Sequence, residues 1–184
     1  MWKPSPEEGF FIEHQRIGGS PERNLCMESE KRADEVITHE VVFPQDTNHY
    51  GTLFGGQMLS WMDKVAYYAA TRFCGHNTVT VSVESIDFAV PVRNGDLLDL
   101  HGRVIHTART SMVIRVDVYK AEMQHTSERV LSHTGYFTFV ALDNEGKPRR
   151  VPTLLLENEE DERLFEVGNR IKEQALARRR SAHR

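Results

Sequence analysis

The chain has 184 residues, of which 39% are hydrophobic and 27% are charged, and its formal net charge is −4. A chain of this size can bury a core of its own, so folding requires neither a metal ion nor disulfides. The balance of 23 basic and 27 acidic residues excludes a general attraction to nucleic acid. No apolar run reaches the roughly 18 residues that a membrane span requires.

The cysteines and the first residues indicate a cellular location. Cys26 and Cys74 form neither a CxxC pair nor a disulfide framework, which favours a reduced compartment. The opening MWKPSPEEGFF lacks the basic and then apolar pattern of a signal peptide. We therefore expect a soluble cytoplasmic protein.

The chain divides into three predicted parts. Residues 1–33 are polar, contain several prolines and glycines, and show no sustained period, so we expect a partly flexible N-terminal extension. Residues 34–152 carry the strand patterns and one long apolar helix, and should form the folded domain. Residues 153–184 contain a charged, weakly amphipathic helix from Glu157 to about Arg179 and a basic tail, which we interpret as a solvated helix end.

The first strand and the long helix come early in the domain. Val36 to Phe43 is rich in β-branched residues and is stopped by Pro44, which predicts a strand. The loop QDTNHYGT follows, and Phe54 to Phe73 then predicts a helix without proline. Its apolar face is so wide that the helix should be largely buried.

Four more segments alternate or are rich in strand-forming residues. They are Val79 to Phe88, Asp96 to Thr107, Ser111 to Ala121 and Arg129 to Leu142. The links between them are short, which favours antiparallel pairing, because parallel strands need long crossovers. A sheet that wraps one helix buries both apolar surfaces, so the sequence predicts an α+β fold with a five-stranded antiparallel sheet around one long helix.

Two glycines open the long helix. Glycine is a poor helix former, so Gly55 and Gly56 together indicate that the backbone must be bare there. The N–H groups of a helix N-terminus could stabilise the oxyanion of a tetrahedral intermediate. The alternative is close packing of the helix against a strand.

Asp63 lies about two turns into the same helix, with Leu59 and Ala66 on its own side. It sits at the border between the apolar face and a polar stripe. That stripe contains Gln57, Ser60, Lys64, Tyr67 and Thr71. A carboxylate there should be partly desolvated and a better base. The alternative is a solvated aspartate paired with Lys64 or Tyr67.

Asn48 lies in the loop before the helix, beside Asp46 and His49. Its amide could orient water or a carbonyl group. The alternative is a residue that stabilises a tight turn through its own backbone.

These residues resemble the acyl-CoA thioester hydrolases of the hotdog fold, of the brain acyl-CoA hydrolase and short bacterial acyl-CoA thioesterase type. The matching residues are Pro44, Asp46, Thr47, Asn48, Gly51, Phe54, Gly55, Gly56, Met62 and Asp63. Further matches are VTVSVESIDF, PVRNGD, the step Thr110-Ser111, and DNEGKPR followed by Val151-Pro152. The similarity extends roughly from Glu35 to Pro152.

The resemblance implies a hotdog domain in which two subunits join their sheets edge to edge, assembled further as a dimer of dimers or a trimer of dimers. It implies that Asp63 acts as general base or nucleophile opposite Asn48 of the neighbouring subunit, with the Gly56 N–H as oxyanion donor and Gly55 beside it. The partner would be the acyl-CoA substrate. No cofactor or metal is implied, and coenzyme A enters only as part of substrate and product.

Coenzyme A also needs contacts to its phosphates. By charge, the candidates are Arg109, Arg93 and Arg149, with Arg150 next to the last. Thr110 and Ser111 join them because the Thr-Ser step belongs to the family pattern. For any single arginine, the more common interpretation is an ordinary solvated side chain.

The nine histidines do not predict a metal site. His101 and His106 are five residues apart on a predicted strand and should point to opposite faces, while His125 and His133 flank a loop. No HExxH pattern and no Cys/His cluster occurs.

Two other functions stay open. One is a non-catalytic module of the same fold that binds acyl-CoA. The other is a hotdog dehydratase of hydroxyacyl thioesters, for which His49 and Asp63 would be the catalytic pair.

Overall fold

The computed structural model describes residues 30–122 and 125–182. In chain order the elements are β1 (Glu30–Lys31), β2 (Val36–Val41), a 3-10 turn η1 (Pro44–Asp46), α1 (Gly55–Cys74), β3 (Thr78–Phe88), β4 (Asp96–Thr107), β5 (Ser111–Glu122), β6 (His125–Ala141), β7 (Thr153–Leu154) and α2 (Glu159–Ala182).

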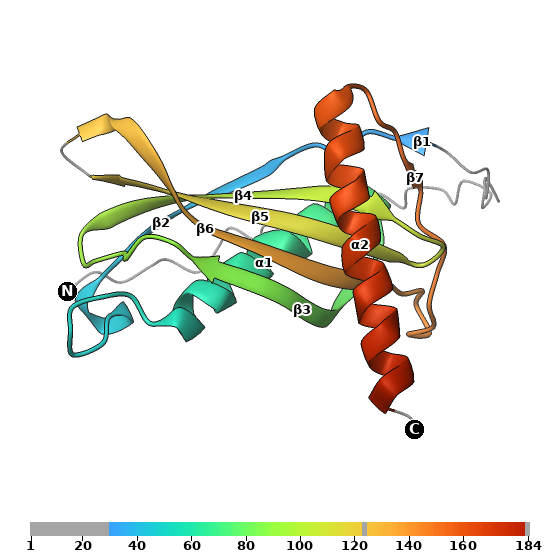
Figure 1. Ribbon diagram of the computed structural model, residues 1–184, viewed down its shortest axis with the longest axis horizontal. Helices are drawn as coiled ribbons and strands as arrows, with labels where there is room; N and C mark the ends of the chain where they lie inside the picture. Colours follow the sequence, from blue (N-terminus) through green and yellow to red (C-terminus); the bar gives the residue numbers. More distant parts are fainter. Residues whose placement is uncertain (1–29, 123–124, 183–184) are drawn as a thin grey trace, which may run out of the picture.

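Five of the strands form one antiparallel sheet in the order β2-β4-β5-β6-β3. The sheet curls around α1, and α2 crosses its other face (Figure 1). This confirms the predicted fold: a five-stranded antiparallel sheet around one long helix, with a C-terminal helix.

The main core lies between α1 and the concave face of the sheet. The helix buries Met62, Val65 and Ala66 completely or nearly so, against strand residues such as Leu98 and Leu100. Two strand glycines let the helix approach closely. A Cβ at Gly102 would lie 2.7 Å from the Val65 side chain, and one at Gly135 would lie 2.7 Å from that of Met62. The backbone of the sheet therefore fixes the position of α1, and with it the position of the residues on its free face.

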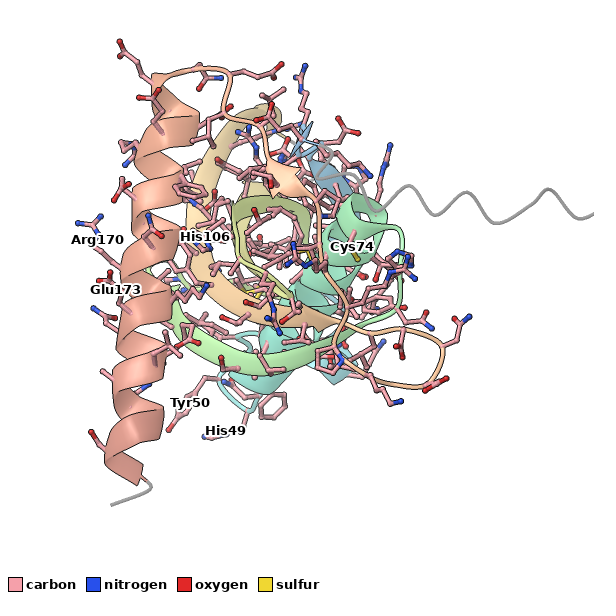
Figure 2. The ribbon with its side chains drawn as sticks, turned by 90° about the vertical axis from the view of Figure 1, so that its right-hand side faces the viewer. His49, Tyr50, Cys74, His106, Arg170 and Glu173 are labelled. Carbon is pink, nitrogen blue, oxygen red and sulfur yellow. The ribbon has the colours of Figure 1, made fainter. Side chains whose placement is uncertain are left out.

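A smaller core lies under α2. Ile105 and Val113 on the outer face of the sheet pack against Leu164 of the helix. A Cβ at Gly168 would lie 2.3 Å from the Cβ of His106. The helix α2 therefore contacts β4 at Gly168, where the helix has no side chain. His106 lies between the sheet and this helix, as Figure 2 shows.

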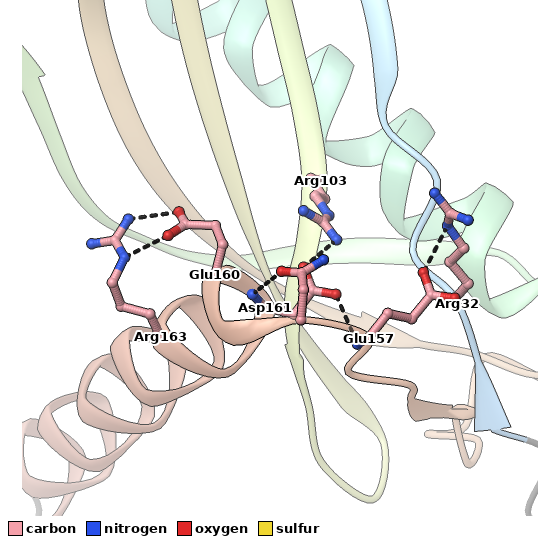
Figure 3. Close-up of polar contacts among 7 residues, drawn as sticks. Arg32, Arg103, Glu157, Glu160, Asp161 and Arg163 are labelled. Carbon is pink, nitrogen blue, oxygen red and sulfur yellow. Dashed lines mark hydrogen bonds and ion pairs between the residues drawn. The ribbon is translucent and has the colours of Figure 1, made fainter.

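Polar contacts fix the start of α2 (Figure 3). Asn158 caps the helix by accepting the Asp161 N–H at 2.9 Å, so the helix begins two residues after the predicted Glu157. The buried Asp161 accepts a hydrogen bond from Arg103 at 2.7 Å. At the other end of α2, Arg178 pairs with the buried carboxylate of Glu84 on β3, so this part of the predicted solvated tail is bound to the sheet.

The strands β1 and β7 were not predicted. They pair in parallel and join Glu30–Lys31 to Thr153–Leu154, next to the two boundaries drawn from the sequence. The Lys31 ammonium group donates to the carbonyls of Arg72 and Phe73 at the end of α1. The rest of the predicted extension, residues 1–29 with Cys26, lies outside the described residues, and the division into three parts stays a prediction.

The prediction that His101 and His106 face opposite sides of the sheet is wrong. A β-bulge interrupts the register between Val104 and His106. His101 contacts Tyr119 and Glu35 on the outer face, and His106 contacts Asn169 of α2 on that same face. His125 and His133 both belong to β6 and do not flank a loop.

Among the described residues, no helix is long and apolar enough to cross a membrane.

Candidate active site

The loop between β2 and α1 is held by its own backbone. The Asp46 carboxylate accepts the Phe43 N–H at 3.0 Å, and the Phe54 N–H donates to the Asp46 carbonyl at 2.9 Å. An isolated bridge pairs Thr47 with Leu53. These contacts set the direction in which the chain enters α1.

Asn48 lies at the centre of this loop. Its Nδ2 donates to Thr52 Oγ1 at 2.9 Å, and its Oδ1 accepts the Tyr50 N–H at 2.9 Å. Within one chain the amide therefore stabilises its own turn, which was the alternative interpretation of the sequence. The same bonds hold the half-buried side chain in a fixed place.

The glycines at the start of α1 are exposed. A Cβ at Gly55 would make an ordinary contact of 3.6 Å with Phe88, whereas one at Gly56 would meet nothing within 4 Å. The N-cap residue, Phe54, has no side-chain acceptor for the free N–H groups of the first turn. The alternative of close packing therefore does not explain Gly56, and the space in front of its backbone is open.

Asp63 is half-buried on α1 and has a partner that the sequence analysis missed. Thr80 Oγ1 on β3 donates to Asp63 Oδ1 at 2.8 Å. The alternative pairing with Lys64 is not what the structure shows, since the Lys64 ammonium lies 3.9 Å from Glu40. Thr80 belongs to the VTVSVESIDF stretch, but which of its residues meets Asp63 depends on the packing of α1 on β3.

The strand that carries Thr80 is an edge of the sheet. Among the described strands β3 pairs only with β6, so its other edge is open. Val79, Val81 and Val83 along it are 38–43% exposed. An open edge with apolar side chains is a surface on which another strand can pair.

One chain does not bring Asn48 and Asp63 together. Asp63 follows Gly55 by eight residues, so it lies about 12 Å further along the helix from the loop end. His49 does not meet Asp63 either. Its ring contacts that of Tyr50 in a tilted arrangement with centroids 3.8 Å apart, and Figure 2 shows both side chains at the periphery of the molecule.

A cavity of about 260 Å³ lies beside the start of α1. Its lining includes Thr52, Gly55 and Met58 from the loop and α1, Phe88 from β3 and His133 from β6. His133 is only 5% exposed, and burial lowers its pKa to about 4. The position of His133 in a predicted strand did not indicate that its side chain would line a cavity.

The candidates for phosphate contacts form two groups. The turn with Arg109, Thr110 and Ser111 lies beside Arg149, because Ala141 bonds through its backbone to both Thr110 and Arg149. These residues are near the C-terminal end of α1. Arg93 forms a bridge with Thr52 and so lies near the opposite end of the helix. Within residues 30–122 and 125–182, no three His, Cys, Asp or Glu side chains are arranged to hold a metal ion.

The sequence matches known proteins over most of this domain. Residues 50–126 match the thioesterase superfamily. Over 142 residues the chain is 41% identical to the uncharacterized acyl-CoA thioester hydrolase YkhA of Bacillus subtilis, which covers 77% of this chain and 79% of that protein. The chain belongs to the acyl-CoA thioester hydrolases of the thioesterase superfamily.

A mouse protein of this family, the cytosolic acyl coenzyme A thioester hydrolase, is 36% identical over 129 residues. The match spans 70% of this chain but only 34% of the mouse protein. This chain therefore corresponds to about a third of the length of the mouse protein.

Solved structures of the family have the same fold. The acyl-CoA hydrolase of Staphylococcus aureus, in complex with butyryl coenzyme A, coenzyme A and coenzyme A disulfide, matches with a TM-score of 0.76 and 33% identity over 81% of this chain and 90% of that one. A hexameric acyl-CoA thioesterase in its apo form matches with a TM-score of 0.77 and 37% identity over 85% and 99%.

Three alanine variants of the Staphylococcus aureus enzyme also match, with TM-scores of 0.79, 0.78 and 0.75. The replaced residues are an asparagine, an aspartate and a threonine at its positions 28, 43 and 60. Asn48, Asp63 and Thr80 are the same residue types at the same spacing.

Proposed function

We propose that this protein hydrolyses acyl-CoA thioesters to a free fatty acid and coenzyme A. Its membership of the acyl-CoA thioester hydrolases supports this activity. The observation that carries the proposal is the hydrogen bond from Thr80 to Asp63, because these two residues and Asn48 repeat the spacing of the three residues replaced in the Staphylococcus aureus enzyme.

Asp63 acts on the thioester as general base or as nucleophile. Thr80 holds its Oδ1, which leaves Oδ2 free to take a proton from water or to attack the carbonyl carbon. The Gly56 N–H donates to the oxyanion that forms. With Asp63 as base, the tetrahedral intermediate expels the thiolate of coenzyme A, which takes up the proton that Asp63 removed from water. With Asp63 as nucleophile, loss of the thiolate leaves an acyl–Asp63 anhydride, and water then hydrolyses it to the free acid and the carboxylate, with its proton passing to the thiolate. A thioester has a good leaving group, so no metal or cofactor is required.

The complete site belongs to two subunits. Asp63 and Thr80 lie at the open edge of the sheet, whereas Asn48 of the same chain lies at the end of the helix. Pairing of two β3 edges brings the loop of a neighbouring subunit to Asp63, where its Asn48 positions the water or the thioester. The hexameric relative supports a further assembly as a trimer of dimers.

Coenzyme A binds through its phosphates to basic and hydroxyl groups. Arg109, Thr110 and Ser111 come from one turn and Arg149 from the adjacent loop, and together they offer charge and hydrogen-bond donors at one place. Arg93 is a separate candidate at the other end of the helix. The cytosolic mouse relative supports a cytoplasmic location for this protein.

The test is Asp63→Ala in a spectrophotometric assay of thiol release across acyl-CoA chain lengths. Loss of the base should lower turnover by about a thousandfold. Lys64→Ala is the matched control, because Lys64 is the next residue of α1 and is exposed. Both variants should retain the fold and the oligomer.

Three outcomes would contradict the proposal. One is unchanged hydrolysis by a folded Asp63→Ala variant. Another is tight binding of acyl-CoA by the unaltered protein without release of thiol, which would indicate a binding module. The last is conversion of hydroxyacyl-CoA to enoyl-CoA, which would indicate a dehydratase.

A further inference from the structure

The cavity beside the start of α1 is lined by two polar side chains, those of Thr52 and His133, and by several apolar ones. Leu53, Met58, Phe88 and residues 89–92 supply most of the apolar lining, and His133 supplies an imidazole ring from β6. Gly55, the neighbour of the proposed oxyanion donor, lines the same cavity. The acyl chain attached to the thioester carbonyl can therefore extend into this space.

The hydrogen bonds around His133 determine which ring nitrogen carries the proton. Ser132 Oγ donates its only proton to the Val118 carbonyl at 3.0 Å. The same Oγ lies 2.9 Å from His133 Nδ1, so Nδ1 must be the donor in that bond. In a neutral ring Nε2 then carries a lone pair and is a hydrogen-bond acceptor.

Nε2 is not enclosed in the core. Among the described residues, the buried side-chain nitrogens that lack a partner belong to His101 and His106 and not to His133. His133 contacts Phe88 edge to face, with ring centroids 5.0 Å apart, and this contact holds the ring at the cavity wall. Because burial lowers its pKa to about 4, the ring is neutral near pH 7 and presents an acceptor without a charge.

We propose that this cavity holds the acyl group of the substrate and that His133 Nε2 accepts a hydrogen bond from a hydroxyl group on it, so that the enzyme prefers hydroxyacyl-CoA to unsubstituted acyl-CoA of equal length. The proposal rests on the hydrolase activity proposed above. The volume of about 260 Å³ is just below the range of roughly 300–1,000 Å³ typical of ligand pockets, which fits a short acyl group.

The test compares kcat/KM for butyryl-CoA, 3-hydroxybutyryl-CoA, 4-hydroxybutyryl-CoA and 3-oxobutyryl-CoA. One good hydrogen bond should favour at least one hydroxy compound over butyryl-CoA about five- to tenfold. The 3-oxo compound offers only acceptors, which oppose the lone pair of Nε2, so it should show no gain.

His133→Phe keeps an aromatic ring against Phe88 and removes the acceptor, so the ratio of hydroxyacyl to acyl hydrolysis should fall to about one. Ser132→Ala is a second variant. It removes the group that fixes the proton on Nδ1 and should lower the ratio only in part.

Equal kcat/KM for all four compounds in the unaltered enzyme would overturn the proposal, and this comparison needs no variant to fold. A preference for hydroxyacyl-CoA that His133→Phe leaves unchanged would overturn it as well. In both cases hydrolysis itself continues and the proposed function stands. Absence of thiol release from every compound would instead overturn the function, and this inference with it.

Discussion

At the scale of single residues, the orientation of the Asp63 carboxylate depends on a hydroxyl group from another element. Thr80 Oγ1 holds Oδ1 at 2.8 Å, and this bond joins the free face of α1 to the edge strand β3. Asp63, Asn48 and the two glycines could be selected from the sequence, because their spacing resembles a known family. Thr80 could not, because it contacts Asp63 only through the packing of the helix on the sheet.

Thr80→Val keeps the shape of the side chain and removes its hydrogen bond. We expect kcat to fall about fivefold, as for loss of one positioning hydrogen bond worth about 1 kcal/mol, with a smaller effect on KM. Thr80→Ser, which keeps the donor, should retain most of the activity. Equal steady-state kinetics for Thr80→Val and the unaltered enzyme would rule out a positioning role.

Gly56→Ala separates the role of the backbone from that of packing. An added Cβ meets nothing within 4 Å, and alanine is up to about 1 kcal/mol better than glycine in a helix, so the free energy of unfolding should not decrease. The methyl group would stand in front of the free N–H, so kcat should fall strongly.

Gly102→Ala should instead lower the free energy of unfolding, because its Cβ would come 2.7 Å from the Val65 side chain. Thermal unfolding and thiol release measured on both variants give the comparison. Full activity of Gly56→Ala would show that catalysis does not require a bare backbone at this position.

At the scale of elements, long periodic segments were predictable and short ones were not. The ranges expected for α1 and for β3, β4 and β5 agree with the structure to within one residue at each end. The two-residue strands β1 and β7 have no period that a sequence could show. The bulge after Val104 turns His106 towards α2, and alternation along a strand cannot predict it. His133 became a candidate only when the fold placed it in a cavity wall.

The docking of α2 depends on Gly168. In Gly168→Ala the new Cβ would collide with His106, so we expect the free energy of unfolding to fall by about 1–3 kcal/mol. Burial, together with Lys172, lowers the pKa of His106, so loosening of the helix should raise that pKa towards its ordinary value. Chemical denaturation and an NMR titration of His106 provide the two measurements.

Gln174→Ala is the control, because Gln174 is exposed on the same helix and should change neither quantity. If Gly168→Ala has the stability of the unaltered protein and the same His106 titration, α2 does not dock through this contact.

At the scale of the whole molecule, the candidate catalytic residues lie in two separate places on one chain. Asp63 and Thr80 face the open edge of β3, and the Asn48 loop lies at the end of the same helix. The sequence carries all three residues, but their separation within one chain became clear only from the helix geometry. In the two-fold dimer that we propose, each subunit gives Asp63 to one site and Asn48 to the other.

The most direct measurement of this central claim is the activity of mixed oligomers. Asp63→Ala and Asn48→Ala subunits are coexpressed in equal amounts with different tags, so that mixed species can be verified. In a random mixture half of the dimers are mixed, and each has one intact site, so we predict about a quarter of the unaltered activity from two nearly inactive parents. Mixed oligomers that are present but no more active than their parents would contradict a site shared between subunits.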